Sequence, residues 1–203
     1  MFIYFDLGNV VALFDRRQAC EQMAAVAGID PARVEQLVFN TPLNDRYERG
    51  EISSQEFYDD FCRETGTKPD FAALFHAKSD IFRLNYSLLP VIARLEDAGF
   101  RLGVLSNTSP CHWEFLCSQG YAILPHAFSV RALSYEIGAL KPESKIYEAA
   151  AKLAGVPPSE IFFCDDTPGH VAAAREAGFD AVQYTTTPKL VADLRSRGLK
   201  FNY

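Results

Sequence analysis

The chain has 203 residues and a formal net charge of −6 at pH 7, with 20 basic and 26 acidic residues interspersed along it. No concentrated basic segment is present to attract a nucleic-acid backbone or an anionic membrane, so we expect no nucleic-acid or membrane partner. Its length can hold one core domain with a large insertion, which is sufficient for an enzyme.

The N-terminal apolar run is only five residues long before Asp6, and it contains no basic leader. No apolar run elsewhere approaches the roughly 18 residues of a membrane span. The five cysteines lack CxxC spacing, which disfavours a zinc site and a disulfide scaffold. We therefore expect a cytoplasmic protein.

Short β-rich runs alternate with amphipathic segments along most of the chain. Strands are predicted at residues 2–5, 102–105, 128–130, 161–164 and 181–184. Helices are predicted at 145–154 and 171–177, and each is followed by a glycine that can end it. This alternation is typical of an α/β fold with a parallel sheet and right-handed crossovers.

Residues 15–87 show a different pattern, with successive helix signals and no convincing strand. Asp30 and Pro31 begin one predicted helix, and Ser53 to Glu56 fits a capping box that begins another. Gly50 is expected to close the helix before that box. We predict a compact helical domain here, inserted into a sheet domain of residues 1–14 and 88–203.

Asp6 follows the first predicted strand, and open α/β sheets bind their ligands at the carboxyl ends of strands. Gly8 allows the backbone to turn sharply after it. Considered alone, Asp6 is explained equally well as a cap of the turn.

Ser106 and Asn107 follow another predicted strand, just before a predicted helix N-terminus. Backbone N–H groups and the helix dipole favour phosphate there, and the Ser106 hydroxyl can donate one more hydrogen bond. A simple helix cap also explains these residues. Lys141 can neutralise a phosphoryl oxygen if it lies near Asp6, although most lysines are solvated surface charges.

Asp165 and Asp166 are adjacent carboxylates at the end of an apolar strand. Such neighbours repel each other and are costly without a cation. Mg²⁺ is a hard cation that accepts a few carboxylate ligands and bridges to phosphate. A pair of acids in a solvated turn is the alternative.

Taken in order, Asp6, Ser106, Lys141 and the Asp165-Asp166 pair resemble the four sequence motifs of the haloacid dehalogenase superfamily of hydrolases. The phrases around Asp6, Ser106 and Arg49 are similar to those of its sugar-phosphate phosphatase branch, typified by bacterial α-glucose-1-phosphate phosphatases. The resemblance covers nearly the whole chain. It implies a Rossmann-like three-layer core with a parallel sheet and an inserted small helical cap domain at 15–87.

By this resemblance, Asp6 attacks phosphorus and forms an aspartyl-phosphate, which water then hydrolyses. Ser106, Asn107 and Lys141 hold the phosphoryl oxygens of a small phosphorylated metabolite. A Mg²⁺ cofactor is held by Asp6, the Gly8 carbonyl and Asp166, with Asp165 either ligating it or orienting a bound water. The protein is expected to be a monomer or a homodimer.

The chain departs from the family at Gly8, where most phosphatases of the superfamily carry a second aspartate as general acid/base. Such a group commonly contributes about 10²- to 10⁴-fold. The sequence leaves open whether Asn9, Asp15, a bound water or the substrate itself replaces this general acid/base. His170, where relatives frequently carry an asparagine, also has an open role.

Substrate contacts are expected from the cap, and its polar or amphipathic candidates are Arg46, Tyr47, Arg49 and His76. Two rival functions remain. One is metal-independent haloacid dehalogenase-type hydrolysis, which suits the missing acid but not the intact acidic pair. The other is a non-catalytic phosphate-binding protein. Retention of Asp6 and Lys141 argues against this second rival, because a protein that only binds phosphate needs no nucleophile.

Overall fold

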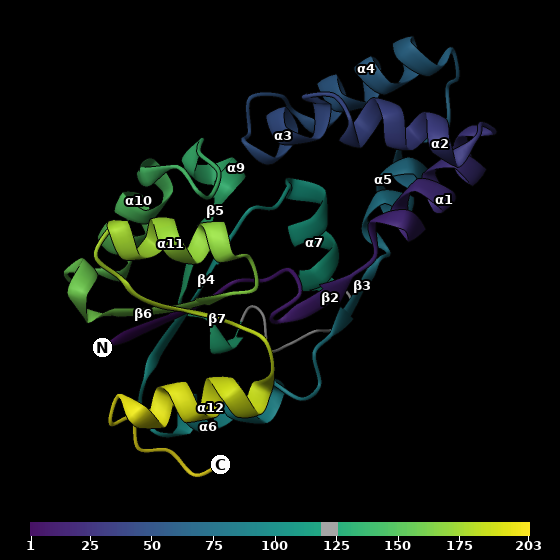
Figure 1. Cartoon of the computed structure of the whole chain (residues 1–203). Coiled ribbons are helices and arrows are strands. Elements are labelled where there is room, and N and C mark those ends of the chain that lie inside the picture. Colours follow the sequence, from purple (N-terminus) through teal and green to yellow (C-terminus); the bar gives the residue numbers. More distant parts are fainter. Residues whose placement is uncertain (119–125) are drawn as a thin grey trace.

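The computed structural model describes residues 1–118 and 126–203, and its centre is one parallel sheet (Figure 1). In chain order the strands are β1 (Phe2–Phe5), β4 (Arg101–Ser106), β5 (Val130–Leu133), β6 (Ile161–Asp165) and β7 (Asp180–Gln183). Their order across the sheet is β5-β4-β1-β6-β7, and every neighbouring pair is parallel. The predicted α/β class is confirmed.

Four of the five predicted strands agree with the structure to within one residue at each end. The predicted bounds of the strand at 128–130 are wrong, because β5 begins at Val130, which pairs with Gly103 of β4. Phe128 is buried for another reason: it precedes the strand and its ring packs 6.0 Å from that of Phe5. An apolar residue packed from a loop therefore resembled a strand residue.

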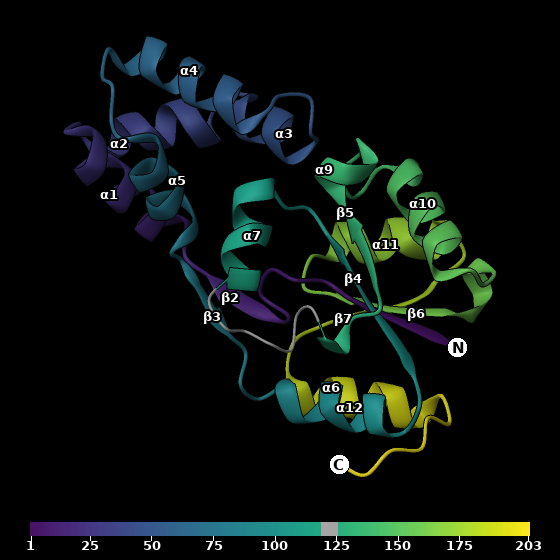
Figure 2. The ribbon, with the colours of Figure 1, turned by 180° about the vertical axis from the view of Figure 1, so that it is seen from behind.

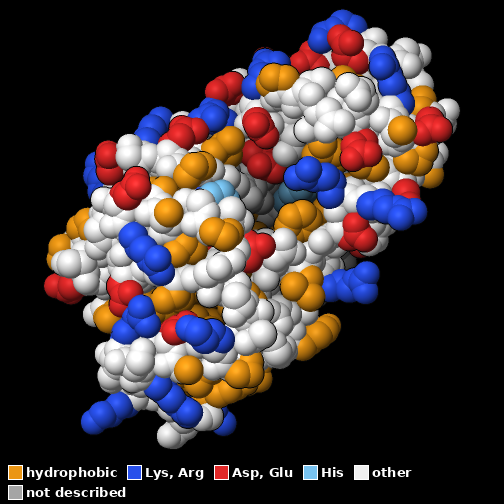
Figure 3. Space-filling view, in the orientation of Figure 1, with side chains coloured by type: hydrophobic (Ala, Val, Ile, Leu, Met, Phe, Trp, Pro, Cys, Tyr) orange, Lys and Arg blue, Asp and Glu red, His pale blue; other side chains and the backbone are white. Residues whose placement is uncertain are grey.

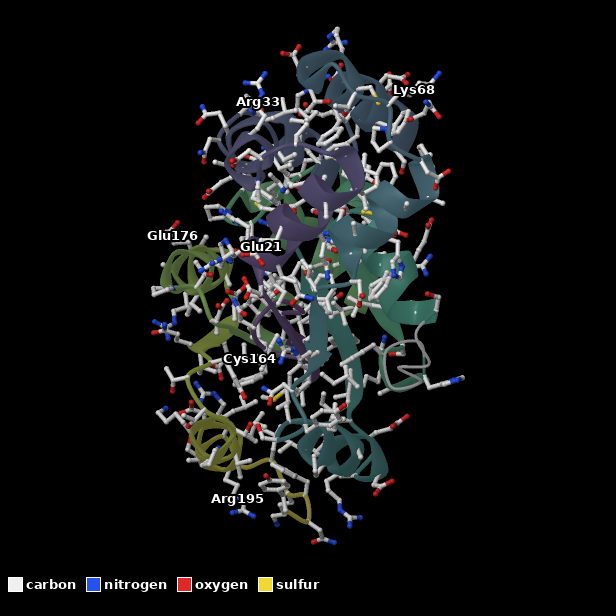
Figure 4. The ribbon with its side chains drawn as sticks, turned by 90° about the vertical axis from the view of Figure 1, so that its right-hand side faces the viewer. Glu21, Arg33, Lys68, Cys164, Glu176 and Arg195 are labelled. Atoms are coloured by element: carbon white, nitrogen blue, oxygen red, sulfur yellow. The ribbon has the colours of Figure 1, made fainter. Side chains whose placement is uncertain are left out.

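Helices cover both faces of the sheet and make three layers (Figures 1 and 2). On one face lie α10 (Ser144–Ala154) and α11 (Pro168–Glu176), and on the other α6 (Leu89–Asp97) and α12 (Thr187–Ser196). Successive strand residues point to opposite faces, so Phe2 and Tyr4 pack under α10 and α11 while Ile3 and Phe5 pack with α6 and α12. Cys164 lies inside this core (Figure 4).

A second body, which we call the cap, gathers at one end of the molecule (Figure 1). It consists of α1 (Arg16–Ala27), α2 (Pro31–Val34), η1 (Glu35–Phe39), α3 (Leu43–Glu48), α4 (Ser54–Thr65) and α5 (Phe71–Ser79). The cap has its own apolar core, and Arg33 and Lys68 mark its outer end (Figure 4). Asp30 caps α2, and Ser53 and Glu56 form the expected capping box.

The cap and the sheet domain are joined by two short strands, β2 (Ala12–Phe14) and β3 (Phe82–Leu84), which pair antiparallel. The expectation of no strand within 15–87 is therefore wrong. A strand of three residues gives too short a pattern to detect, and its partner lies at the far end of the insertion. The domain division at 14/15 and 87/88 stays a prediction, since this strand pair crosses it.

The remaining described elements are short or lie between the two bodies. They are α7 (Pro110–Ser118), α9 (Ser134–Ile137) and η2 (Pro158–Glu160). Cys111 at the start of α7 belongs to the apolar core of the cap, so α7 contacts the cap directly. None of the described helices is long and apolar enough to cross a lipid bilayer.

Residues 48–50, at the end of α3, dock the cap on the core. The buried Ser134 hydroxyl of α9 donates to the Glu48 carbonyl oxygen at 2.6 Å, and the Arg49 guanidinium lies 2.5 Å from the Glu143 carboxylate. Gly50 has φ 70°, and a Cβ there would overlap the Tyr135 carbonyl oxygen. Only glycine allows both this backbone conformation and this close approach.

Gly50→Ala is expected to lower the free energy of unfolding by about 3 kcal/mol, since left-handed strain of about 1–2 kcal/mol adds to overlap of about 1–3 kcal/mol. Gly66→Ala is the matched control, because Gly66 has the same φ of 70° and nothing within 4 Å of a Cβ. It should lose only the strain contribution. Urea unfolding followed by circular dichroism measures both, and equal losses would contradict tight docking at Gly50.

Candidate active site

The carboxyl ends of three neighbouring strands bring the predicted site residues together. Asp6 follows β1, Ser106 ends β4 and Asp165 ends β6, and β1 lies between the other two strands. Lys141 reaches the same place from the loop between α9 and α10. Parallel strands deliver their carboxyl ends to one edge, so residues far apart in sequence become neighbours.

The Lys141 ammonium lies between two carboxylates. Its Nζ donates to Asp6 Oδ1 at 2.7 Å, to Asp165 Oδ2 at 2.6 Å and to the Leu105 carbonyl oxygen at 3.2 Å. The Lys141 side chain is 1% exposed, so the alternative of a solvated surface lysine is wrong. Buried charges are tolerated when they are paired and hydrogen-bonded in this way.

Asn107 fixes the loop that carries this lysine. The Asn107 Oδ1 accepts from the Lys141 backbone N–H at 2.7 Å, and its Nδ2 donates to the Lys141 carbonyl oxygen at 3.0 Å. These two bonds use both ends of one amide. Asn107 therefore positions Lys141 through the backbone and leaves the ammonium free to bind the carboxylates.

The two carboxylates differ in their protonation equilibria. Burial raises the pKa of Asp6 to about 6, because the Lys141 charge only partly offsets the desolvation and the Asp165 charge adds to it. Burial also acts to raise the pKa of Asp165, but the charge of Lys141 and the hydrogen bonds from His170 and Lys141 lower it to about 2. Asp165 is thus the firmly ionised member of the pair.

Three carboxylates can hold a metal ion. Oxygen atoms of Asp6, Asp165 and Asp166 all lie within 4.8 Å of one another. The Asp166 carboxylate is oriented by Asn9, whose Nδ2 donates at 3.2 Å, and by Thr167, whose hydroxyl donates at 3.2 Å. A set of carboxylate oxygens fits a hard divalent cation such as Mg²⁺.

A cavity of about 300 Å³ lies between the core and the cap, at the end of these strands. The space-filling view shows the hollow where the two bodies meet, with histidine side chains beside it (Figure 3). Its polar lining comes from the core as Asp6, Gly8, Asn9, Asn107, Lys141, Asp166, Thr167 and His170, and from the cap as Arg16, Asn44, Asp45, Glu48 and Lys78. His112 of α7 and the apolar side chains of Phe14, Ala19, Phe39 and Ile81 complete the lining. Its volume is at the lower end of small-molecule sites, which are about 300–1,000 Å³.

Ser106 reaches the site differently from its expected role. It is 1% exposed and does not line the cavity, and its hydroxyl donates to the Asn107 carbonyl oxygen at 3.2 Å. Asn107, the next residue, lines the cavity instead. A contact between the Ser106 hydroxyl and a phosphoryl oxygen therefore stays a prediction.

The four cap residues singled out from sequence do not line the cavity. Arg49 pairs with Glu143 and Glu51, and Arg46 pairs with Glu51 and Asp60. Tyr47 is buried within the cap core and His76 is exposed beside Asp80. We therefore do not assign Arg49 to the substrate site.

The cap residues that do line the cavity were missed. Asn44 and Glu48 are four residues apart on α3, so they lie on one face, whereas Tyr47 faces the cap core. Lys78 was hidden because it is 1% exposed and sits near the end of an apolar helix. The helical spacing of Asn44 and Glu48 was the available signal.

The structure gives the positions of His170 and Asp15, two residues whose roles the sequence left open. His170 Nδ1 lies 3.1 Å from Asp165 Oδ1, and its side chain lines the cavity. Asp15 caps the N-terminus of α1 and does not line the cavity. Of these two, only His170 is placed to touch a ligand.

His112 of α7 completes the wall behind Lys78. Its Nε2 lies 3.2 Å from the Lys78 Nζ, so the imidazole accepts from the ammonium. Burial and the adjacent Lys78 charge hold the pKa of His112 well below its usual value. His112 is therefore neutral in the folded protein near pH 7.

Comparisons with known proteins agree with the fold. A profile of the haloacid dehalogenase-like hydrolases matches residues 4–178. The chain is 28% identical to a D-ribitol-5-phosphate phosphatase of Bacteroides thetaiotaomicron, over 89% of this chain and 90% of that one. It is 26% identical to an (S)-2-haloacid dehalogenase of Pseudomonas putida, over 87% and 81%. A Bacteroides thetaiotaomicron enzyme of the family, crystallised with magnesium and inorganic phosphate, is similar with a TM-score of 0.80 and 24% identity, over 91% and 94%.

His112 is expected to make the fold sensitive to mild acid. Below about pH 6.5 the unfolded chain protonates this histidine while the folded chain does not, so the free energy of unfolding falls by up to about 1.4 kcal/mol per pH unit. Urea unfolding at pH 7.5 and 5.5 measures the loss. His112→Asn should show a smaller loss, whereas the control His76→Asn, at an exposed histidine, should match the unaltered protein.

Proposed function

The chain belongs to the haloacid dehalogenase-like hydrolases, and from that premise we propose that it is a Mg²⁺-dependent phosphatase of a small phosphate monoester. The substrate class is a sugar phosphate, and the reaction passes through an aspartyl-phosphate on Asp6. The observation that carries the proposal is the buried Lys141 ammonium bound to Asp6 and Asp165 beside Asp166, at the floor of a small cavity.

Asp6 supplies the nucleophilic carboxylate oxygen. It forms a bond to phosphorus while the bond from phosphorus to the ester oxygen breaks, and water later cleaves the acyl-phosphate bond. Lys141 neutralises a phosphoryl oxygen and Asn107 holds the loop in place. Asp6, Asp166 and the Gly8 carbonyl would hold Mg²⁺, with Asp165 as a ligand or as the partner of its bound water. The ion would offset the charge between the carboxylate and the incoming phosphate.

Gly8 is the position where a general acid is absent, and a side chain there would press on the Phe14 ring. A Cβ at Gly8 would lie 3.0 Å from Cε1 of the Phe14 ring. An aspartate there would require that ring to move. The leaving oxygen therefore takes its proton from another source, which suits an ester oxygen that leaves readily.

The names of the relatives support a sugar or sugar-alcohol phosphate. One acts on D-ribitol 5-phosphate, and the related crystal structure contains magnesium and inorganic phosphate. The cavity volume of about 300 Å³ suits a leaving group of that size.

Dehalogenation is the second candidate, and Gly8 together with the dehalogenase relative favours it. A halide leaves without needing a proton. Against it stand Asp165 and Asp166, because dehalogenases of this superfamily act without metal and need no such metal cluster. A non-catalytic phosphate binder is disfavoured by the buried nucleophile and its paired lysine.

Asp6→Asn is expected to lower phosphate release by at least about 10³-fold, because the nucleophile is lost while the shape is kept. A screen of sugar phosphates, acyl phosphates and nucleotides identifies the substrate on which the loss is measured. Asp15→Asn is the control, since asparagine also caps a helix and Asp15 lies outside the cavity. Turnover of Asp6→Asn at the unaltered rate would refute the mechanism.

Metal removal distinguishes the two candidate reactions. EDTA is expected to abolish phosphate release and added Mg²⁺ to restore it, whereas dehalogenation should continue in EDTA. Mg²⁺ should also raise the melting temperature. At a hundred times its dissociation constant, the ion should add about 2.7 kcal/mol to the free energy of unfolding. Asp166→Asn should need more Mg²⁺ for both effects, and an unchanged metal titration would contradict its role as a ligand.

A further inference from the structure

The cap side of the cavity carries a hydrogen-bond acceptor that nothing satisfies. Asn44 Nδ2 donates to Glu48 Oε1 at 2.9 Å, and both residues line the cavity. Asn44 Oδ1 is buried and has no hydrogen-bond partner among the described residues. Buried carbonyl oxygens in native structures are nearly always paired, so an unpaired one beside a cavity indicates a donor on the ligand.

A buried cation lies on the same wall. Lys78 is 1% exposed and lines the cavity, yet it forms no ion pair within the part of the chain that the structure describes. Its Nζ contacts His112 Nε2 at 3.2 Å and lies 5.7 Å from the ring centroids of Tyr47 and Phe57. An ammonium has three protons, and one hydrogen bond to His112 leaves others to donate to a ligand.

The charges of this wall are balanced. Glu48 and Asp45 line the cavity together with Lys78 and Arg16, and burial raises the pKa of the Glu48 carboxyl against the opposing effect of the Lys78 charge. A second phosphate or a carboxylate would find a negative side chain beside each positive one. A neutral group that both donates and accepts hydrogen bonds fits better, and hydroxyl groups do so.

We propose that Asn44, Glu48 and Lys78 form a subsite that binds the hydroxyl groups of a neutral polyol leaving group, and that this subsite selects sugar or sugar-alcohol phosphates over other phosphate esters. One hydroxyl donates to Asn44 Oδ1 or Glu48, and a neighbouring hydroxyl accepts from Lys78. This inference rests on the proposed phosphatase function, with the phosphate on the core side of the cavity and the polyol on the cap side.

The test compares two leaving groups in the same enzyme. Asn44→Leu keeps the shape of the amide, and Lys78→Met keeps the length of the lysine. On the best sugar or sugar-alcohol phosphate of the screen, each variant is expected to lose about 10- to 100-fold in kcat/KM, because a site built to bind hydroxyls is left unsatisfied. On acetyl phosphate, whose leaving group has no hydroxyl to bind, both should stay within about two-fold of the unaltered enzyme.

Arg46→Met is the matched control, because Arg46 lies on α3 but outside the cavity, and both rates should be unchanged. Equal losses on the two substrates would overturn the subsite, since they would indicate a general structural role. A wild-type enzyme that cleaves acetyl phosphate but shows no preference for polyol phosphates would also overturn it, while leaving the phosphatase proposal intact.

If the wild-type protein released no phosphate from any substrate, the phosphatase proposal would fail and binding would decide the subsite. Free ribitol and free glucose at high concentration are then the probes, read by thermal unfolding. A rise in melting temperature in the wild type that is absent in Asn44→Leu supports the subsite. No rise in the wild type overturns it.

Discussion

The molecule depends on one buried arrangement of charge, the Lys141 ammonium held between Asp6 and Asp165. Two carboxylates this close repel each other, and the attraction of each carboxylate to the ammonium offsets that repulsion. The arrangement can exist only where three separate parts of the chain meet, at the ends of β1 and β6 and in the loop before α10. The parallel sheet and its order are what bring these parts together, so the fold is the scaffold of a single electrostatic contact.

The cap adds chemistry that the core lacks. The core side of the cavity offers carboxylates, a lysine and amides suited to a phosphoryl group and a cation, whereas the cap side offers a balanced set of polar groups. Neither body encloses the cavity alone. Phe14, in the strand pair that joins the two, lies beside Gly8, so that a Cβ there would come within 3.0 Å of its ring.

Much of this could be read from the sequence, and the failures have physical causes. The positions of Asp6 and Asp165 at the ends of apolar strands marked them as site candidates. A charge buried there costs free energy unless a partner or a metal ion offsets it. The helical starts at Asp30 and Ser53 follow local capping rules. Local patterns could not reveal β3, whose pairing is long-range. They also pointed to Arg49, a partly buried arginine that pairs with Glu143 and Glu51, and not to Lys78, which is recognised only once its burial against the cavity is known.

The Ser134 hydroxyl links the cap to the segment of the core that holds Lys141. Its fully buried Oγ lies 2.6 Å from the Glu48 carbonyl oxygen of the cap and accepts from the Thr108 N–H at 2.9 Å. Thr108 directly follows Asn107, the residue that holds the Lys141 loop. A swing of the cap away from α9 would break a bond to a hydroxyl that also binds Thr108 just before α7, beside this loop. The contact that holds the cap on the core is therefore continuous, through Thr108 and Asn107, with the loop that places the Lys141 ammonium beside Asp6.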